Sequence, residues 1–277
     1  MWKNIKRFIS KNVYQYKYKI TKILSLFGLW PLFYKMYCAI FGPNGGTLKV
    51  DLAGKSAKFY VHSQAAADDF KSLWGEGYLL ESLMKISKPG DCIYDVGAEI
   101  GLYSVFLSMA VGENGQVVAF EPEEIRYKRL KGNLLLNNLN NVSIFSTALG
   151  DKNREEKLLV GRDNVAPGFI NLSEAKSKDE TFQMVKIMNG DEFIYQNHLS
   201  LPKAIKIDVE GYEYYVIKGL EKTLKSDTCQ IVCCEIHPKM LPPDIDSNMV
   251  LDLIKFYGFA KIDIHHREND FQVIAQK

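Results

Sequence analysis

The chain has 277 residues, of which 47% are hydrophobic and 25% charged, proportions typical of a globular protein. This length suits one large α/β domain with elaborations, or a domain with an N-terminal appendage. The net charge of +2 conceals an asymmetry, because residues 1–50 contain nine Lys or Arg and no Asp or Glu. The remainder is therefore net acidic, which argues against nucleic acid as a partner.

The cysteines indicate a reducing environment. Their spacing forms no metal-ligand set, and most of them lie in or beside apolar runs, where free cysteine behaves as a small buried hydrophobe. Their odd number points the same way, so we expect a cytoplasmic protein without a zinc site. The five are Cys38, Cys92, Cys229, Cys233 and Cys234.

Residues 1–45 are predicted to form an N-terminal helical segment, which is basic and aromatic over 1–22 and strongly apolar over 23–41. A cleaved signal peptide fits poorly, because the apolar part starts late and lacks a clear small-residue cleavage site. A membrane-spanning helix would be interrupted by Pro31 and would contain Lys35.

Two main interpretations of this segment remain. Residues 1–41 either lie as an interfacial helix pair on an anionic membrane, with Trp30, Tyr34 and Tyr37 at headgroup depth, or pack as a helical cap on the main domain. The first would make the protein peripheral at the membrane. A glycine-rich breaker marks the boundary, so we assign residues 46–277 to the main domain.

The main domain is predicted to open with a β-hairpin and a helix. Residues 47–62 alternate between apolar and polar around Gly54, which is typical of a hairpin. Residues 65–85 have a helical pattern with a break near 75–77.

The most informative stretch follows, where a short apolar strand, 92–96, runs into a glycine-containing turn and then a helix. Such a construction places a helix N-terminus and free backbone N–H groups beside a ligand. Gly97 permits the tight turn, and Gly101 lets the ligand or the strand approach the helix closely. Taken alone, the turn would equally suit an ordinary strand-to-helix connection.

A second strand, 116–120, ends at Glu121, about one βαβ unit further on. A carboxylate there can accept hydrogen bonds from both hydroxyls of a ribose, although a solvated strand end would look the same in sequence. A dinucleotide site would need glycine at the middle position of the turn, where this chain has the bulky anion Glu99. A nucleoside without phosphate, whose charged part is an amino acid, fits better, and S-adenosylmethionine is the obvious one.

The third strand, 142–146, is followed by Thr147 and Ala148, which would flank the adenine in a doubly wound sheet. Residues 152–190 then form a predicted β-rich insertion, which we expect to select the substrate. Its short β-like runs are 157–160, 169–172 and 184–188.

Three further candidates follow apolar strands in the second half of the chain. Asp208 and Glu210 would orient the methionine amino group or take a proton from an attacking hydroxyl. The alternative for Asp208 is a cap of the helix predicted over 209–220. His237 follows the strand 230–234 and is either a general base or a structural residue.

The chain is predicted to close with a helix, 247–256, and two strands, 260–264 and 271–275. The polar loop between these strands contains His265, His266 and Arg267, and we interpret the pair of histidines as a solvated hairpin tip.

Three motifs together carry a family resemblance: DVGAEIGLYS at 95–104, FEP at 120–122 and KIDVEG at 206–211. In order and spacing, over about residues 75–240, they resemble the FkbM family of S-adenosylmethionine-dependent methyltransferases. The resemblance implies an α/β class I methyltransferase fold, Rossmann-like, with a seven-stranded mixed sheet whose last strand is antiparallel. It also implies methyl transfer from S-adenosyl-L-methionine, usually to a hydroxyl of a sugar, glycolipid or polyketide-type product.

The resemblance also implies residue roles. The residues expected at the cofactor are Asp95, Gly97, Ala98, Glu99, Gly101, Glu121, Thr147, Ala148 and Asp208, and those expected at the reaction centre are Asp208, Glu210 and His237. The chain departs from the family at Glu99, where Asn is usual. An extra carboxylate near the methionine carboxylate should weaken cofactor binding unless a cation or the substrate offsets it.

We therefore predict an O-methyltransferase that transfers methyl directly and in line to a small-molecule or glycan acceptor, without a metal. The N-terminal segment suggests an acceptor at a membrane. Two other classes stay open: a non-enzymatic membrane-associated adaptor, which only Glu99 favours, and a nicotinamide-dependent oxidoreductase, which the absent glycine disfavours. The sequence indicates no oligomeric state.

Overall fold

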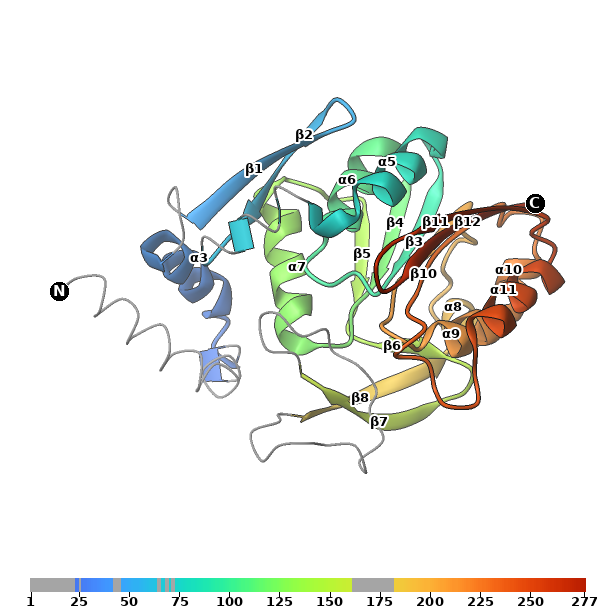
Figure 1. Ribbon diagram of the computed structural model, residues 1–277. Helices are drawn as coiled ribbons and strands as arrows, with labels where there is room; N and C mark the ends of the chain where they lie inside the picture. Colours follow the sequence, from blue (N-terminus) through green and yellow to red (C-terminus); the bar gives the residue numbers. More distant parts are fainter. Residues whose placement is uncertain are drawn as a thin grey trace.

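A computed structural model describes residues 23–24, 26–41, 46–63, 66–67, 70, 73–160 and 182–277. Its centre is a seven-stranded sheet with the strand order β11-β12-β10-β9-β3-β4-β5 (Figure 1). The strands are β3 (Cys92–Val96), β4 (Gln116–Phe120), β5 (Val142–Phe145), β9 (Ala204–Ile207), β10 (Ile231–Ile236), β11 (Lys261–His266) and β12 (Phe271–Gln276).

Strand directions confirm the predicted class I methyltransferase architecture. The pairs from β10 through β9, β3 and β4 to β5 are all parallel, whereas β12 is antiparallel to both β10 and β11. The chain order reverses between β3 and β9, so their carboxyl ends form the crevice where open α/β sheets bind ligands.

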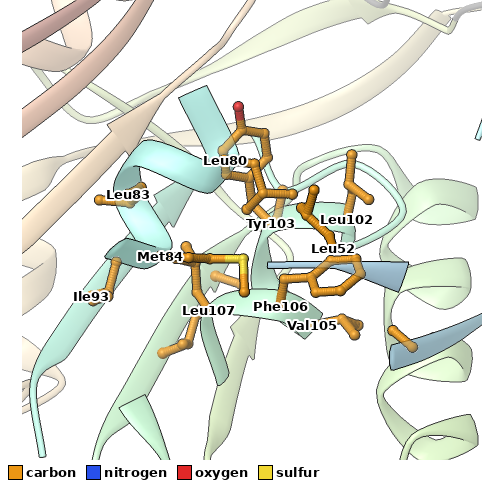
Figure 2. Close-up of a cluster of buried hydrophobic side chains, with 14 of the residues drawn as sticks. Leu52, Leu80, Leu83, Met84, Ile93, Leu102, Tyr103, Val105, Phe106 and Leu107 are labelled. Atoms are coloured by element: carbon orange, nitrogen blue, oxygen red, sulfur yellow. The ribbon is translucent and has the colours of Figure 1, made fainter. Parts of the chain in front are cut away.

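Helices cover both faces of this sheet. On one face lie α5 (Gly77–Ile86), α6 (Leu102–Val111) and α7 (Glu124–Leu136), and on the other α8 (Gly190–Gln196), α9 (Glu213–Gly219), α10 (Glu221–Lys225) and α11 (Ser247–Phe256). Alternation along each strand feeds both cores: Ile93 joins the first, shown in Figure 2, while Tyr94 and Val96 join the second. Burial on both faces explains why the parallel strands are continuous apolar runs in the sequence.

Two smaller sheets flank the main one. The predicted hairpin is confirmed as β1 (Thr47–Leu52) paired with β2 (Lys55–Tyr60). In the insertion, β7 (Arg154–Leu159) and β8 (Phe182–Asn189) join β6 (Ala148–Gly150) in the order β6-β8-β7. The β-like run predicted at 169–172 lies outside the described residues.

The N-terminal helix α3 (Trp30–Phe41) packs on the domain. Trp30, Tyr34 and Cys38, spaced one helical turn apart, are buried, and the ring of Tyr34 meets that of Tyr60 edge-on at 5.9 Å between centroids. The expectation that Trp30 and Tyr34 lie at headgroup depth is therefore wrong, because this stripe faces protein. Among the described residues, no helix is both long and apolar enough to cross a membrane.

Candidate active site

The glycine turn after β3 brings three segments into close contact. Gly97 has φ +80°, and a Cβ at this position would lie 1.8 Å from the carbonyl oxygen of Asp208. The glycine therefore allows the ends of β3 and β9 to meet. At Gly101, with φ +91°, a Cβ would lie 2.5 Å from Leu130 of α7. The close neighbour of Gly101 is thus this helix, and not the ligand or strand that we predicted.

Glu121 is a fixed, buried hydrogen-bond acceptor at the end of β4. Its Oε2 accepts the backbone N–H of Glu99, and its Oε1 accepts that of Glu123, each at 2.8 Å. Only 4% of the residue is exposed, so the alternative of a solvated strand end is wrong. Burial raises the pKa of this carboxyl to about 7. Each oxygen keeps a second lone pair for a ligand.

The unusual Glu99 has a cationic partner. Its Oε1 lies 2.7 Å from Nη1 of Arg126, whose side chain is 17% exposed and also lies 3.4 Å from Glu123. Arg126 therefore supplies the cation that the sequence required to offset Glu99. An arginine in the first turn of α7 gives no local signal of this role, because its partner is 27 positions earlier.

We expect Arg126→Gln to weaken the binding of S-adenosylhomocysteine, the demethylated cofactor. One partly exposed uncompensated charge is worth about 1 kcal/mol, or roughly fivefold in affinity. Calorimetric titration measures the effect. The double variant with Glu99→Gln should recover most of the lost affinity, because the anion is then removed as well. If the double variant binds as weakly as the single one, the offsetting role of Arg126 is refuted.

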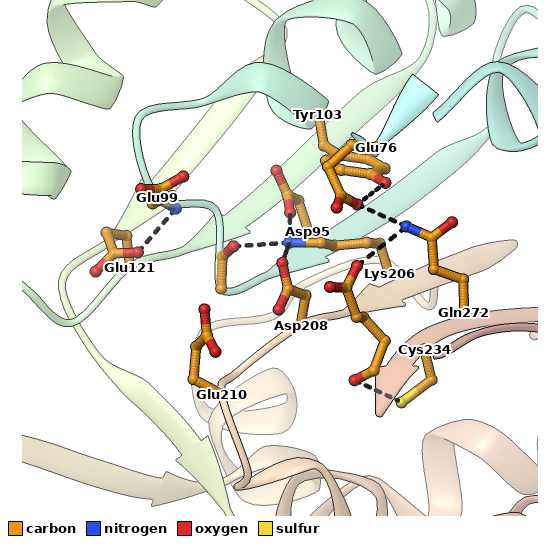
Figure 3. A network of polar contacts seen from close by, with 12 residues as sticks. Glu76, Asp95, Glu99, Tyr103, Glu121, Lys206, Asp208, Glu210, Cys234 and Gln272 are labelled. Carbon is orange, nitrogen blue, oxygen red and sulfur yellow. Dashed lines mark hydrogen bonds and ion pairs between the residues drawn. The ribbon is translucent and has the colours of Figure 1, made fainter. Parts of the chain in front are cut away.

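Lys206 joins the turn to the ends of β3 and β9 (Figure 3). Its Nζ donates to the carbonyl oxygen of Gly97 at 2.7 Å and lies 3.4 Å from Asp95 and 3.5 Å from Asp208. Asp95 is fully buried and accepts the hydroxyl of Ser104 at 2.6 Å. Asp95 therefore lies beneath the turn and acts on the site through Lys206, a residue that the sequence analysis did not single out.

His237 lies among carboxylates from neighbouring strand ends. Its Nδ1 is 2.9 Å from Glu213, and its Nε2 is 3.4 Å from both Glu210 and Glu235 and 3.9 Å from Asp208. Burial alone would lower its pKa, but the hydrogen bond to Glu213 and the nearby anions, Glu235 and Asp208 among them, raise it to about 11. A protonated imidazole cannot accept a proton, so the general-base role predicted for His237 would require that proton to be displaced.

Asp208 does not cap the following helix. α9 begins at Glu213, later than predicted, and its N-cap is Tyr212, so the capping alternative is wrong. The residues between form a turn in which Glu210 has φ +52°. Burial raises the pKa of Asp208 to about 6 and that of Glu210 to about 7. Both carboxylates are about one-quarter exposed, so they are accessible to a ligand.

A second polar group adjoins this cluster and was missed in the sequence. Glu76 accepts the hydroxyl of Tyr103 at 2.8 Å, and Arg267 lies 2.5 Å from Glu76 and 3.2 Å from Glu235. Arg267 follows β11 directly, and its side chain turns inward toward these two carboxylates. The side chains of Asp208, Glu235 and His237 lie close enough together to hold a metal ion.

The predicted adenine contacts lie at the opposite side of the turn. Thr147 and Ala148, after β5, are buried, and the Thr147 hydroxyl donates to the carbonyl oxygen of Lys186 at 3.1 Å. The structure thus brings the candidates together along one edge of the sheet. Their roles toward a ligand stay predictions.

Comparison with known proteins now identifies the family. The model of the methyltransferase FkbM domain matches residues 95–261, which is more than half of the chain and includes the carboxyl end of β3 and all of β9 and β10. The chain belongs to the FkbM methyltransferase family. It is an enzyme of the methyltransferase class, and S-adenosyl-L-methionine is its cofactor.

Several known proteins are similar to this FkbM-family chain. The hexuronic acid methyltransferase AglP of Haloferax volcanii is 25% identical over 228 residues, covering 79% of this chain and 89% of that protein. A putative rRNA methylase from Clostridium thermocellum shares 15% identity with a TM-score of 0.46, covering 72% of this chain and 93% of that one. A SAM-dependent methyltransferase from Aquifex aeolicus shares 17% identity with a TM-score of 0.40, covering 71% and 88%.

Proposed function

We propose that this FkbM-family enzyme methylates a hydroxyl group of a sugar, glycolipid or related glycan. The observation that carries the proposal is the arrangement along one sheet edge. A fixed carboxylate, Glu121, lies on one side of the glycine turn, and two accessible carboxylates, Asp208 and Glu210, lie on the other. The similarity to a hexuronic acid methyltransferase favours a sugar acceptor.

The residues present suit the cofactor. S-adenosylmethionine, when bound, supplies an electrophilic methyl group on a sulfonium. Glu121 would accept hydrogen bonds from the ribose hydroxyls, because both its oxygens are held by backbone N–H groups and keep free lone pairs. Thr147 and Ala148 would contact the adenine. The turn over 97–101 would adjoin the methionine part, with Asp208 accepting from its amino group.

The remaining groups would act on the acceptor. In the overall transfer, an oxygen–carbon bond forms, the carbon–sulfur bond breaks, and the hydroxyl proton leaves to a carboxylate. Glu210 and Asp208 are the accessible carboxylates that would lie beside the reaction centre. Nε2 of His237 lies 3.4 Å from Glu210 and 3.9 Å from Asp208 and would keep both in position. Holding the two reactants in line is the main contribution, since well-oriented reactants gain about 7–11 kcal/mol over free ones.

Glu121→Ala tests the cofactor site. Two hydrogen bonds to a charged acceptor are worth roughly 1.5–3 kcal/mol each, so the variant should bind S-adenosylhomocysteine at least about 100-fold more weakly. Calorimetry on the folded full chain measures this, with NAD as a ligand that should not bind. Glu124→Ala, on the neighbouring helix turn, is the control. Unchanged affinity in Glu121→Ala would refute the ribose role.

A panel of acceptors tests the reaction itself. We expect S-adenosylhomocysteine release with hydroxylated sugars, uronic acids among them, and none with the corresponding sugars blocked at the hydroxyl. Cofactor binding without turnover on any hydroxylated glycan would contradict the proposed acceptor class. The pairing of Glu99 with Arg126 also removes the one feature that favoured a non-enzymatic adaptor.

We also propose that the N-terminal segment holds the enzyme against an anionic membrane. The outer face of α3 carries apolar side chains one turn apart, of which Leu32 is 59%, Met36 54% and Ile40 49% exposed. These lie next in sequence to the basic residues 1–22. An exposed apolar stripe beside cationic residues is the pattern that binds the headgroup region of anionic lipids.

Flotation with vesicles tests this contact. The full chain should float with vesicles of phosphatidylcholine containing phosphatidylglycerol and much less with phosphatidylcholine alone. The triple variant Leu32→Ser, Met36→Ser, Ile40→Ser should lose most of the binding. Leu135→Ser, which changes an equally exposed leucine on α7, is the control. Equal flotation of the triple variant and the wild type would refute the surface.

A further inference from the structure

The two nitrogens of His237 have different environments. Nδ1 lies 2.9 Å from Oε1 of Glu213, a fully buried carboxylate whose Oε2 has no hydrogen-bond partner among the described residues. Nδ1 can only donate to a carboxylate, so its proton is fixed there. A metal-ligating histidine usually donates the N–H of its second ring nitrogen to such a carboxylate. This hydrogen bond fixes the tautomer and orients the first nitrogen toward the metal.

Nε2 points into a ring of three carboxylates. The oxygens of Glu210 and Glu235 lie 3.4 Å from it and that of Asp208 lies 3.9 Å away. A hydrogen bond between imidazolium and carboxylate would be about 2.7–2.9 Å long. A divalent ion with bonds of about 2.1–2.4 Å instead keeps adjacent ligand atoms roughly 3.0–3.4 Å apart and opposite ones about 4.2–4.8 Å apart. The two 3.4 Å separations match adjacent ligand atoms, the 3.9 Å separation lies between the adjacent and the opposite values, and the ligand atoms of Asp208, Glu235 and His237 all lie within 4.8 Å of one another.

The charge of the cluster also calls for a cation. Lys206 forms ion pairs with Asp95 and Asp208. Arg267 forms ion pairs with Glu76, Glu235 and Asp270. In the part of the chain that the structure describes, the ion pairs of Glu210 and Glu213 are with His237 alone. The imidazole of His237 thus faces Glu210 and Glu213, which no lysine or arginine in that part of the chain neutralises. It also lies near Asp208 and Glu235, whose cations, Lys206 and Arg267, pair with other carboxylates as well.

We propose that Asp208, Glu235 and His237 bind one divalent cation, through Asp208 Oδ1, Glu235 Oε1 and His237 Nε2. Glu210 adjoins as a further carboxylate ligand. An imidazole with several carboxylates suits ions of the Mg²⁺ and Mn²⁺ type better than soft, thiolate-seeking ions. Strands β9 and β10 are hydrogen-bonded neighbours, so the fold itself holds the ligands together before the ion arrives.

The role of this ion rests on the proposed function. The cluster lies where Asp208 and Glu210 would meet the acceptor, so the cation would attract the acceptor hydroxyl and ease loss of its proton. Binding at Nε2 would also displace the proton that His237 otherwise holds. The ion and the methyl donor would then occupy adjacent parts of one crevice, with Asp208 between them.

Manganese titration of the chelator-treated full chain tests the site, with free Mn²⁺ followed by electron paramagnetic resonance. We expect one Mn²⁺ per chain, displaced by Mg²⁺ in excess. His237→Ala and Asp208→Asn should lose this binding. Glu213→Gln, which keeps every ligand atom, should bind Mn²⁺ about 10–100-fold more weakly, the usual effect of losing a carboxylate behind a ligating histidine. Circular dichroism confirms that each variant is folded.

Matched controls separate this site from the surface and from the cofactor site. His265→Ala and Asp252→Asn, which change an exposed histidine and an exposed aspartate, should bind Mn²⁺ as the wild type does. Glu121→Ala should also keep the ion while losing the cofactor, so the two proposals fail independently. No saturable Mn²⁺ site in the wild type, or equal affinity in folded His237→Ala, would show that His237 holds the carboxylates only as a charged imidazole.

Discussion

Replacing Lys206 by methionine is expected to destabilise the protein by about 3–5 kcal/mol, the usual effect of removing one partner of a buried ion pair. Methionine keeps an unbranched side chain only one atom shorter, but it leaves the fully buried Asp95 without its cation and the carbonyl of Gly97 without its donor. Urea unfolding followed by circular dichroism measures the change.

Two comparisons make this prediction specific. Lys218→Met, which changes an exposed lysine on α9, should alter the free energy of unfolding by less than about 0.5 kcal/mol. Adding Asp95→Asn to Lys206→Met should restore part of the stability, because the uncompensated charge is then removed. A loss in Lys206→Met no larger than in Lys218→Met would mean that Lys206 is not the link between the strands.

Gly97→Ala should have an effect of similar size for a different reason. The new methyl group would lie 1.8 Å from the carbonyl oxygen of Asp208, so the ends of β3 and β9 would have to separate. Left-handed backbone strain of roughly 1–2 kcal/mol adds to about 1–3 kcal/mol for overpacking. We expect lower stability together with loss of S-adenosylhomocysteine binding, measured by urea unfolding and calorimetry.

Gly90→Ala is the matched control. Gly90 also has a positive φ, +91°, but a Cβ there would have nothing within 4 Å. This variant should therefore show only the backbone strain and should bind the cofactor normally. If Gly97→Ala and Gly90→Ala are equally stable, the close approach of the two strand ends contributes nothing measurable.

Local sequence patterns predicted the bounds of the helices and strands well, but they did not predict which side chains contact one another across the fold. The strands β3 and β4 and the helix α11 have the predicted bounds, because apolar runs and helical periodicity are properties of neighbouring residues. Helix α9 begins at Glu213 and not at 209, since the chain first makes a tight turn that lets Glu213 reach His237. No periodicity in the sequence marks that turn.

In the candidate site, too, local sequence predicted the residues at strand ends but not the residues that pair with them over long sequence separations. Asp208 and Glu121 could be found because parallel strands end at one edge of the sheet. Arg126 and Arg267 could not, because each pairs with residues far away in sequence, 191 positions in the case of Arg267 and Glu76. Lys206 had one usable signal: a lysine between two isoleucines of a buried strand needs an anion beside it.

Helix α7 contacts both the glycine turn after β3 and the N-terminal helix α3. Its first turn carries Arg126, which pairs with Glu99 in the glycine turn after β3, while Lys128 and Arg129 lie over the rings of Trp30 and Tyr34 in α3. A truncated chain that starts at Gly46 would therefore remove the α3 side chains that pack on the same helix whose Arg126 pairs with Glu99. Shortening the chain to test the proposed lipid contact would therefore also disturb α7, so point changes on the outer face of α3 test that contact more cleanly.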